Sequence, residues 1–196
     1  LFDKQESPIN HQVFEARKYM TYKRIEDYGL IGNMHTAALV GNDGSIDWLC
    51  LPFFDAPAVF NSILDDEKGG RFSISAVDAV DNRQIYFPDT NILITRFGSD
   101  HSAAQVTDFM PVHEEHDLSG DPWTGDSGEL CCSDSKVIRL AHGVLGKTNM
   151  RMECTPAFEF ASTDHQVEKT ANGVIFTSDN GQKLSLTAEC EFEIEN

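Results

Sequence analysis

The chain has 196 residues, of which 40% are hydrophobic and 13 are phenylalanines, enough to build the core of one large domain. Its 32 acidic and 15 basic side chains give a formal charge of −17. Such a field repels phosphate backbones and anionic lipids, so we expect neither a nucleic acid nor a membrane as partner, while neutral and cationic ligands stay open. No apolar run approaches the ~18 residues that a transmembrane helix needs.

The N-terminal residues and the cysteines both bear on where the protein resides. The first segment, LFDKQESPINHQVF, has neither the basic start nor the apolar run of a signal peptide, and the chain has no Asn-x-Ser/Thr acceptor. Five scattered cysteines without a Cys-x-x-Cys pair are typical of reduced thiols. We therefore expect a cytoplasmic protein. The sequence does not begin with Met, so a removed signal stays open.

In chain order, residues 1–23 are polar and weakly patterned, and we predict an N-terminal arm there. From residue 24 to residue 196, short β-rich runs alternate with turn signals such as Asn-Asp-Gly, and we predict one domain. The predicted strands are 36–41, 45–51, 70–77, 83–88, 92–99, 102–112, 135–146, 149–158, 165–173, 173–179 and 182–195.

The stretch LVGNDGSIDWLCLPFFDAP, residues 39–57, is the densest in signals. Asn42, Asp43 and Gly44 predict a tight hairpin turn. Alternation after the turn predicts that Ile46, Trp48 and Cys50 share one face and that Asp47, Leu49 and Leu51 share the other. Pro52 ends the strand. The candidate ligand or domain-interface residues lie near this end of the hairpin: Trp48 on the strand, and Phe53, Phe54 and Asp55 in the corner that follows it.

One internal segment has helical spacing. In residues 56–69, APAVFNSILDDEKG, Val59, Phe60, Ile63 and Leu64 recur with a helical period, and Pro57 suits a helix start. Eleven strands and one short helix predict an all-β fold, two packed antiparallel sheets.

Later in the chain, Asp108 lies between apolar neighbours, so we expect it to be buried and hydrogen-bonded, with Arg96 or backbone amides as partners. Residues 113–134 are acidic and rich in Gly and Ser, which favours a mobile loop. The HEEHD run at 113–117 has no second ligand pair, so we expect no metal site. No phosphate loop and no Ser-His-Asp set are present, and we expect no cofactor.

The last predicted strand and the cysteines carry two further expectations. Between residues 182 and 195, glutamates alternate with apolar residues, which predicts a solvated acidic face or one covered by a neighbour. Cys50, Cys154 and Cys190 have apolar contexts and are predicted to fill the core. The vicinal pair Cys131 and Cys132 lies in a polar loop, where redox activity is a weaker alternative.

Residues 25–74, IEDYGLIGNMHTAALVGNDGSIDWLCLPFFDAPAVFNSILDDEKGGRFSI, resemble the start of glycoside hydrolase family 15 proteins of the glucoamylase and trehalase type. The resemblance continues through YFPDTNILITRF, VTDFMPV, VIRLAHGVLGKTNMRMECTPAFEFA and GVIFTS, and so covers roughly residues 22–190. It implies an antiparallel β-supersandwich that precedes an (α/α)6 barrel. It also implies that the family's two catalytic glutamates, which act by inversion, belong to that barrel and not to this chain.

The key motif departs from the family at one position: Phe53 stands where the family usually has Arg before Phe-Asp. Phenylalanine cannot pair with a carboxylate or bind a sugar hydroxyl, which puts the usual substrate preference in doubt. Trp48 and Phe54 could stack on a sugar face. Alternatively, Trp48 packs between the sheets and Asp55 caps the following helix.

Two functions stay open from the sequence. The first is the non-catalytic N-terminal domain of a family 15-like glycosidase, which packs on its own C-terminal barrel and borders the site of a neutral α-glucoside such as trehalose or a malto-oligosaccharide. The second is a stand-alone sandwich that binds carbohydrate or forms a homo-oligomer through exposed strands.

Overall fold

The computed structural model describes residues 22–112, 135–190 and 193. Within these residues the chain forms a short 3-10 turn, thirteen strands and one four-residue helical turn. The elements are η1 (Ile25–Asp27), β1 (Tyr28–Gly32), β2 (Ala37–Gly41), β3 (Ser45–Cys50), β4 (Ala58–Phe60), β5 (Arg71–Ala76), β6 (Asp81–Tyr86), β7 (Leu93–Gly98), β8 (Ala103–Phe109), β9 (Ile138–Leu145), β10 (Met150–Thr155), α1 (Phe158–Ala161), β11 (His165–Lys169), β12 (Gly173–Ser178) and β13 (Lys183–Thr187).

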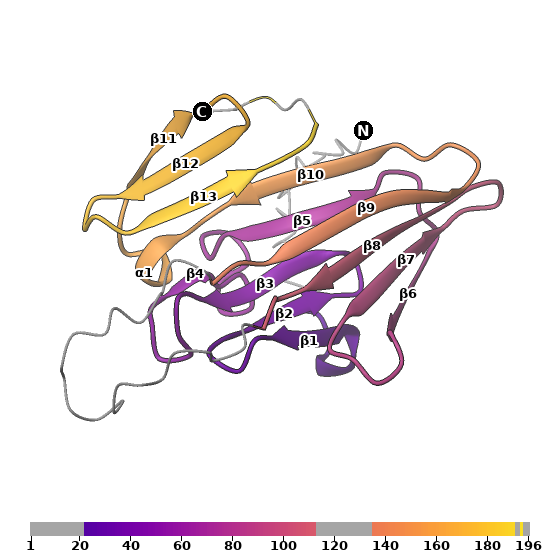
Figure 1. Ribbon diagram of the computed structural model, residues 1–196, viewed down its shortest axis with the longest axis horizontal. Coiled ribbons are helices and arrows are strands. Elements are labelled where there is room, and N and C mark those ends of the chain that lie inside the picture. The colour runs from indigo at the N-terminus through magenta and orange to yellow at the C-terminus, as the bar shows by residue number, and fades with distance from the viewer. Residues whose placement is uncertain (1–21, 113–134, 191–192, 194–196) are drawn as a thin grey trace, which may run out of the picture.

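The strands form three antiparallel sheets (Figure 1). The six-stranded sheet has the order β1-β2-β3-β5-β10, with β4 paired to β3, and the four-stranded sheet has the order β6-β7-β8-β9. The third sheet, β11-β12-β13, follows α1. The prediction of an all-β antiparallel fold is confirmed, with a third, smaller sheet beside the two that were predicted. The described residues contain one short helix, α1, and no helical barrel.

The core lies between the sheets, because each contributes its apolar face. One cluster joins Ile31, Val40 and Ile46 of the six-stranded sheet to Leu93 of the four-stranded sheet and Phe176 of the third. A second cluster joins β5 to β7 and β8. Alternation along β7 and β8 supplies this burial, since every second residue of each strand is buried.

At the edge where β6 lies against β1 and β2, side chains of β6 hydrogen-bond to the facing backbone. The Tyr86 hydroxyl accepts a hydrogen bond from the Leu30 N–H at 2.7 Å and donates to the Leu30 carbonyl at 2.9 Å. The Gln84 amide donates to the carbonyls of Val40 and Gly41 at 3.2 and 3.0 Å. Four uncharged hydrogen bonds thus join the two main sheets here.

The predicted helix over residues 56–69 is wrong. Residues 58–60 form β4, which pairs with β3 through the partners Leu49–Phe60 and Cys50–Ala58. All three β4 residues are buried, and turns closed by Asn61, Asp65 and Gly69 follow. A β-branched and an aromatic residue packed on a strand therefore outweigh the helical spacing. The short strands β1 and β4 were both missed by the sequence analysis.

The last predicted strand is shorter than expected, since β13 ends at Thr187. Its predicted apolar face is confirmed at Leu184 and Leu186, which pack against the core. Cys50 is buried and Cys154 half-buried as predicted, but Cys190 is exposed beyond the strand end, so its predicted place in the core is wrong. Burial raises the pKa of the Cys154 thiol to about 12, although nearby Arg139 opposes the rise.

Tyr22 and Lys23, the end of the predicted arm, contact the sandwich. The Tyr22 hydroxyl donates to the Leu64 carbonyl, and Lys23 binds β3 side chains.

No helix in the described part of the chain is long and apolar enough to cross a membrane.

Candidate functional site

The β2–β3 hairpin is confirmed by the structure. The Gly44 N–H donates to the Gly41 carbonyl at 2.9 Å, and Gly44 has a φ of +83°, which glycine adopts without strain. A Cβ atom at this position would lie only 2.1 Å from the Ile74 carbonyl oxygen. The turn therefore requires glycine both for its conformation and for its close approach to β5.

A register shift within the hairpin changes the predicted faces of β3. The pairing with β2 shifts between Leu39 and Val40, so that Ile46 and Leu49 both reach the core. Strict alternation had predicted these two residues on opposite faces, and that prediction is wrong because a bulge advances one strand by a residue. Asp47 lies on the other side, where it is 4% exposed.

The four predicted ligand or interface residues differ in exposure and in their neighbours. Trp48 is half-buried rather than enclosed between sheets, and its ring lies 6.1 Å from that of Phe160. Phe53 is half-buried and meets His35 edge to face at 6.2 Å. Phe54 is 60% exposed and Asp55 is exposed. Because β4 follows, Asp55 has no helix to cap, and that alternative is wrong.

Phe160, the partner of Trp48, belongs to a left-handed turn. Phe158 anchors the turn with 1% exposure, and Glu159, Phe160 and Ala161 have φ values of 51°, 59° and 63°. Left-handed conformations are costly for residues with a Cβ atom. The Glu159 carboxylate accepts hydrogen bonds from Thr163 and Asn180, which ties the strained turn to the third sheet.

Replacing Ala161 by glycine should raise the free energy of unfolding by about 0.5–1 kcal/mol, because glycine adopts a positive φ without strain and the Ala161 side chain is exposed. Chemical denaturation of both proteins measures the change. The control is Ala171→Gly at another exposed position without a positive φ, where the extra flexibility of the unfolded chain should be neutral or slightly destabilising. A destabilised Ala161→Gly protein would contradict the strain argument.

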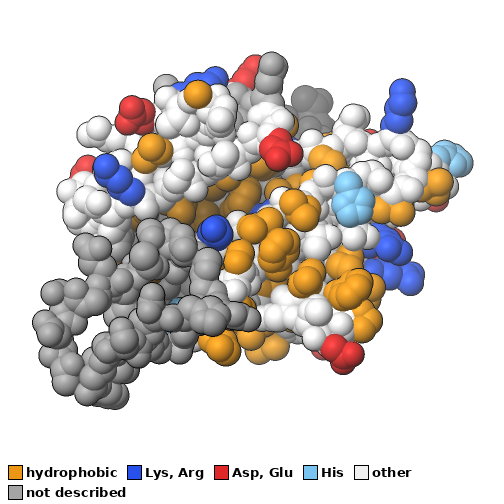
Figure 2. All heavy atoms as spheres, in the orientation of Figure 1, with side chains coloured by type: hydrophobic (Ala, Val, Ile, Leu, Met, Phe, Trp, Pro, Cys, Tyr) orange, Lys and Arg blue, Asp and Glu red, His pale blue; other side chains and the backbone are white. Residues whose placement is uncertain are grey.

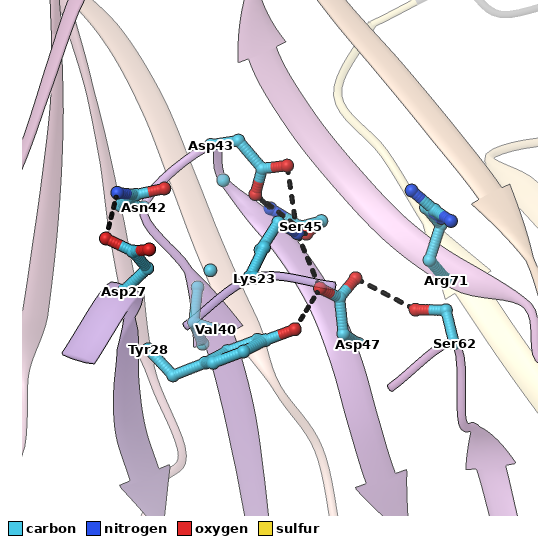
Figure 3. A network of polar contacts seen from close by, with 12 residues as sticks. Lys23, Asp27, Tyr28, Val40, Asn42, Asp43, Ser45, Asp47, Ser62 and Arg71 are labelled. Carbon is cyan, nitrogen blue, oxygen red and sulfur yellow. Dashed lines mark hydrogen bonds and ion pairs between the residues drawn. The ribbon is translucent and has the colours of Figure 1, made fainter. Parts of the chain in front are cut away.

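The most connected polar group is the Lys23–Asp47 cluster, which we define as Lys23, Tyr28, Asp43, Ser45, Asp47 and Ser62 (Figure 3). The Lys23 ammonium lies 2.5 Å from Asp47 Oδ2 and 2.9 Å from Asp43 Oδ2. Tyr28 and Ser62 each donate a hydroxyl hydrogen bond to Asp47 at 2.9 Å. Asp43 accepts a hydrogen bond from the Ser45 hydroxyl at 2.8 Å.

Burial and neighbouring groups determine the protonation states of Asp47 and Tyr28 in this cluster. Burial alone would raise the pKa of Asp47, but hydrogen bonds from Lys23, Ser45 and Tyr28 and the charge of Lys23 outweigh it, and the pKa falls below its ordinary value. Burial and the hydrogen bond to Asp47 raise the pKa of Tyr28. Asp47 is therefore an ionised acceptor and Tyr28 a neutral donor near neutral pH, so Asp47 cannot serve there as a general acid.

A cavity of about 180 Å³ opens beside the cluster. Tyr22, Asp66 and Arg71 complete its lining. Arg71 binds the Asp66 carboxylate and donates to the Asp66 carbonyl at 3.1 Å. Burial on its own lowers the pKa of Arg71, but Asp66 and the charge of Asp47 raise it overall. Because these charged groups already pair with one another, the cavity wall consists of two sets of internal ion pairs. Lys23 pairs with Asp43 and with Asp47 of β3, and Arg71 of β5 pairs with Asp66.

Asp108 is buried and hydrogen-bonded as predicted, but its predicted side-chain partner is wrong. Arg139 of β9 binds Asp108 with two hydrogen bonds of 2.8 and 3.2 Å, and both side chains are almost fully buried. Arg96 points to the opposite face of the sheet, where it donates to Gln105 at 3.2 Å. Asp108 pairs with the buried Leu93, whereas Arg96 pairs with Gln105. The two charged residues therefore lie on opposite faces of the sheet.

Arg139 also reaches the other main sheet. Its guanidinium donates to the carbonyls of Phe72 and Gly44, both at 2.6 Å, and stacks over the Phe72 ring at 4.7 Å. A single arginine thus joins β8, β5 and the hairpin turn.

Sequence reasoning missed Arg139 and Lys23. A usable signal existed for Arg139, since Val137, Ile138 and Leu140 flank it as apolar residues flank Asp108, and two opposite charges in apolar strands suggest a buried pair. For Lys23 there was none, because the polar residues before it read as an arm.

The metal prediction falls largely outside the described residues, as do Cys131 and Cys132 and the expected mobile loop at 113–134. Among the residues that the structure does describe, no three His, Cys, Asp or Glu side chains gather closely enough to hold a metal ion.

Comparison with known proteins places this sandwich in a family. A family model described as "Trehalase-like, N-terminal" matches residues 18–121. The trehalase of Thermoplasma volcanium is 35% identical over 88% of this chain, and that of Thermoplasma acidophilum is 33% identical over 80%. The trehalase of Mycolicibacterium smegmatis is 29% identical over 74%.

The matched region is a minor part of each relative. The chain spans 26%, 24% and 21% of the lengths of those three proteins, respectively. No solved structure matches this chain. The family model and the length of the aligned region agree with the resemblance carried by the hairpin motif: the chain belongs to the trehalase-like N-terminal domain family.

Proposed function

We propose that this chain is the non-catalytic N-terminal domain of a cytoplasmic enzyme that hydrolyses an α-glucosidic bond, with trehalose as substrate. The observation that carries this proposal is the alignment of 88% of the chain with about a quarter of a protein named trehalase. In this reading the catalytic residues belong to the C-terminal remainder of the longer polypeptide, an (α/α)6 barrel in family 15 glycosidases.

The chemistry of the described residues supports a non-catalytic role. An inverting glycosidase needs one carboxylic acid to protonate the leaving group and one carboxylate to activate water, separated by the space for that water. The two buried aspartates, Asp47 and Asp108, are each held by a basic side chain and hydroxyl or guanidinium donors. Asp108 lies in the core and Asp47 in the wall of the cavity, and internal partners hold both carboxylates in their ion pairs.

The domain's task is to pack on the catalytic part and to shape the border of its sugar site. The corner after β3 offers Phe54 and Asp55, both exposed, as an aromatic face and a hydroxyl acceptor suited to a neutral sugar. Phe53, half-buried against His35, holds that corner from within.

The test is glucose release by two purified proteins, the 196-residue chain and the full-length product of its gene. We expect the full-length protein to release glucose from trehalose faster than from maltose, and the 196-residue chain to release none from either. Hydrolysis by the short chain would contradict the non-catalytic role. A gene product near the 21.8 kDa of this chain would instead favour a stand-alone module.

A further inference from the structure

The outer face of the four-stranded sheet is apolar, although a solvated sheet face is usually polar. The register places Ile85, Ile94, Thr107 and Leu140 in one row across β6, β7, β8 and β9. These positions alternate with buried residues such as Leu93, Thr95 and Asp108, so the row points away from the core. Ile85 is 58% and Leu140 53% exposed.

A second apolar row adjoins the first. Phe109 pairs with Ile138, both half-buried, and Phe87 just beyond β6 is 55% exposed. We call Ile85, Phe87, Ile94, Phe109, Ile138 and Leu140 the outer apolar face. Figure 2 shows hydrophobic side chains gathered over these strands on the viewer's side. Grouped apolar exposure of this kind marks interaction surfaces, whereas single exposed residues do not.

A basic border runs along the other side of the row. The register aligns Arg83, Arg96, Gln105 and His142 across the same four strands. Arg96 is exposed and donates only to the neutral Gln105 among the hydrogen bonds and ion pairs of the described residues, while Arg83 pairs with Asp81 at the surface. On a chain with net charge −17, this is a local excess of positive charge.

We propose that the outer apolar face is the surface on which the remainder of the full-length polypeptide packs. The contacting surface of that remainder is apolar at its centre and carries carboxylates opposite Arg83 and Arg96. This inference rests on the proposed function and identifies its interface. The relatives supply the occupant, since about three quarters of their length lies outside the part matched here.

Charge complementarity favours that occupant over a second copy of the chain. A second copy packed face to face would bring another set of Arg83, Arg96 and His142 to the interface, with Asp81 the only acidic residue aligned beside them on β6. Like charges across an interface are costly, whereas an acidic partner surface would be attracted and correctly oriented.

Hydroxyl-radical footprinting tests the interface directly, because it reports the solvent access of individual side chains. We would compare oxidation of Ile85, Phe87 and Leu140 in the 196-residue chain and in the full-length protein. We expect oxidation to be about five-fold or more slower in the full-length protein, since interface cores exclude water. Val167 on β11, 40% exposed, serves as the internal reference and should not change.

A variant separates docking from folding. Leu140→Asp in the full-length protein should restore fast oxidation of Ile85, which lies on the opposite edge strand and would not respond to a local change on β9. The matched control is Val167→Asp, an exposed apolar residue of another sheet. In the 196-residue chain, Leu140→Asp should leave the melting temperature nearly unchanged, because Leu140 is already 53% exposed.

The outcomes are distinguishable from those of the proposed function. Trehalose hydrolysis with unchanged oxidation of the outer apolar face would overturn this inference and leave the proposed function standing. Slower oxidation of the outer apolar face without trehalose hydrolysis would contradict trehalose as the substrate and would support the proposed interface. Protection that appears in the 196-residue chain as its concentration rises would show a second copy as the occupant and overturn the one proposed.

Discussion

Replacing Arg139 by methionine should lower the free energy of unfolding by about 4 kcal/mol, because it leaves the Asp108 carboxylate buried without its cation. The cost includes more than the ion pair. The carbonyls of Phe72 and Gly44 lose their charged guanidinium donor at the same time, although the Gly44 carbonyl keeps the Ile74 N–H as a donor at 3.1 Å.

Urea denaturation measures this change, with Arg151→Met as the matched control. Arg151 pairs with Glu153 on β10, but both side chains are largely exposed, so its loss should change the unfolding free energy by less than about 1 kcal/mol. The double variant Asp108→Leu with Arg139→Met should recover only part of the loss, since the carbonyls of Phe72 and Gly44 still lack the guanidinium donor. If Arg139→Met and Arg151→Met lowered the unfolding free energy equally, the stabilising role of the buried Arg139–Asp108 pair would be refuted.

Replacing Lys23 by methionine should destabilise the protein by about 2 kcal/mol near neutral pH, less than the loss of Arg139, because Tyr28 and Ser62 still donate to Asp47. The signature of this variant is its pH dependence. With Lys23 in place, the pKa of Asp47 in the folded protein lies below its unfolded value, which is about 3.9.

The sign follows from linkage. In the parent protein, Asp47 contributes its full stabilisation above the unfolded pKa and loses it as the pH falls through the lower folded pKa. Without Lys23, Asp47 loses the hydrogen bond and the charge that most lower its pKa, so burial weighs more and the folded pKa moves upward. The ionised carboxylate then contributes less stability than in the parent, so the variant and the parent diverge as the pH rises.

Denaturation curves at several pH values between about 3 and 7 test this divergence. The difference in unfolding free energy between Lys23→Met and the parent should be small near pH 3 and should grow toward neutral pH. Lys183→Met, at an exposed position on β13, is the control and should show a small difference without a trend. A Lys23→Met effect that is constant with pH would contradict the assigned role of Asp47.

The sequence predicted the strands better than their contacts. Alternation located eleven of the strands because one face of each packs on a core, and the Asn42–Gly44 turn was recognised from its own residues. The same local reasoning failed at β4, whose Val59 and Phe60 have helical spacing but bury themselves beside β3. Pairing with a distant strand determined the structure there, and no local pattern contains that information.

The site residues show the same limit. The burial of Asp108 followed from its apolar neighbours, but its partner depended on which strand, β7 or β9, presents an arginine on the inner face. Lys23 was unpredictable for a different reason, since a polar segment has no periodicity and its contact with Asp47 spans 24 positions. Charge partners distant in sequence require the register of the sheets, which the sequence alone does not provide.

The polar contacts between the two main sheets differ between the β6 side and the β9 side of the sandwich. Along β6, Tyr86 and Gln84 make neutral hydrogen bonds to the backbone of β1 and β2. On the β9 side, the charged Arg139 binds Asp108 and the Phe72 carbonyl. Loss of Arg139 removes the charged contacts to β5 and the hairpin turn but leaves β9 paired with β8. We therefore expect the two main sheets to separate more readily on the β9 side than along β6.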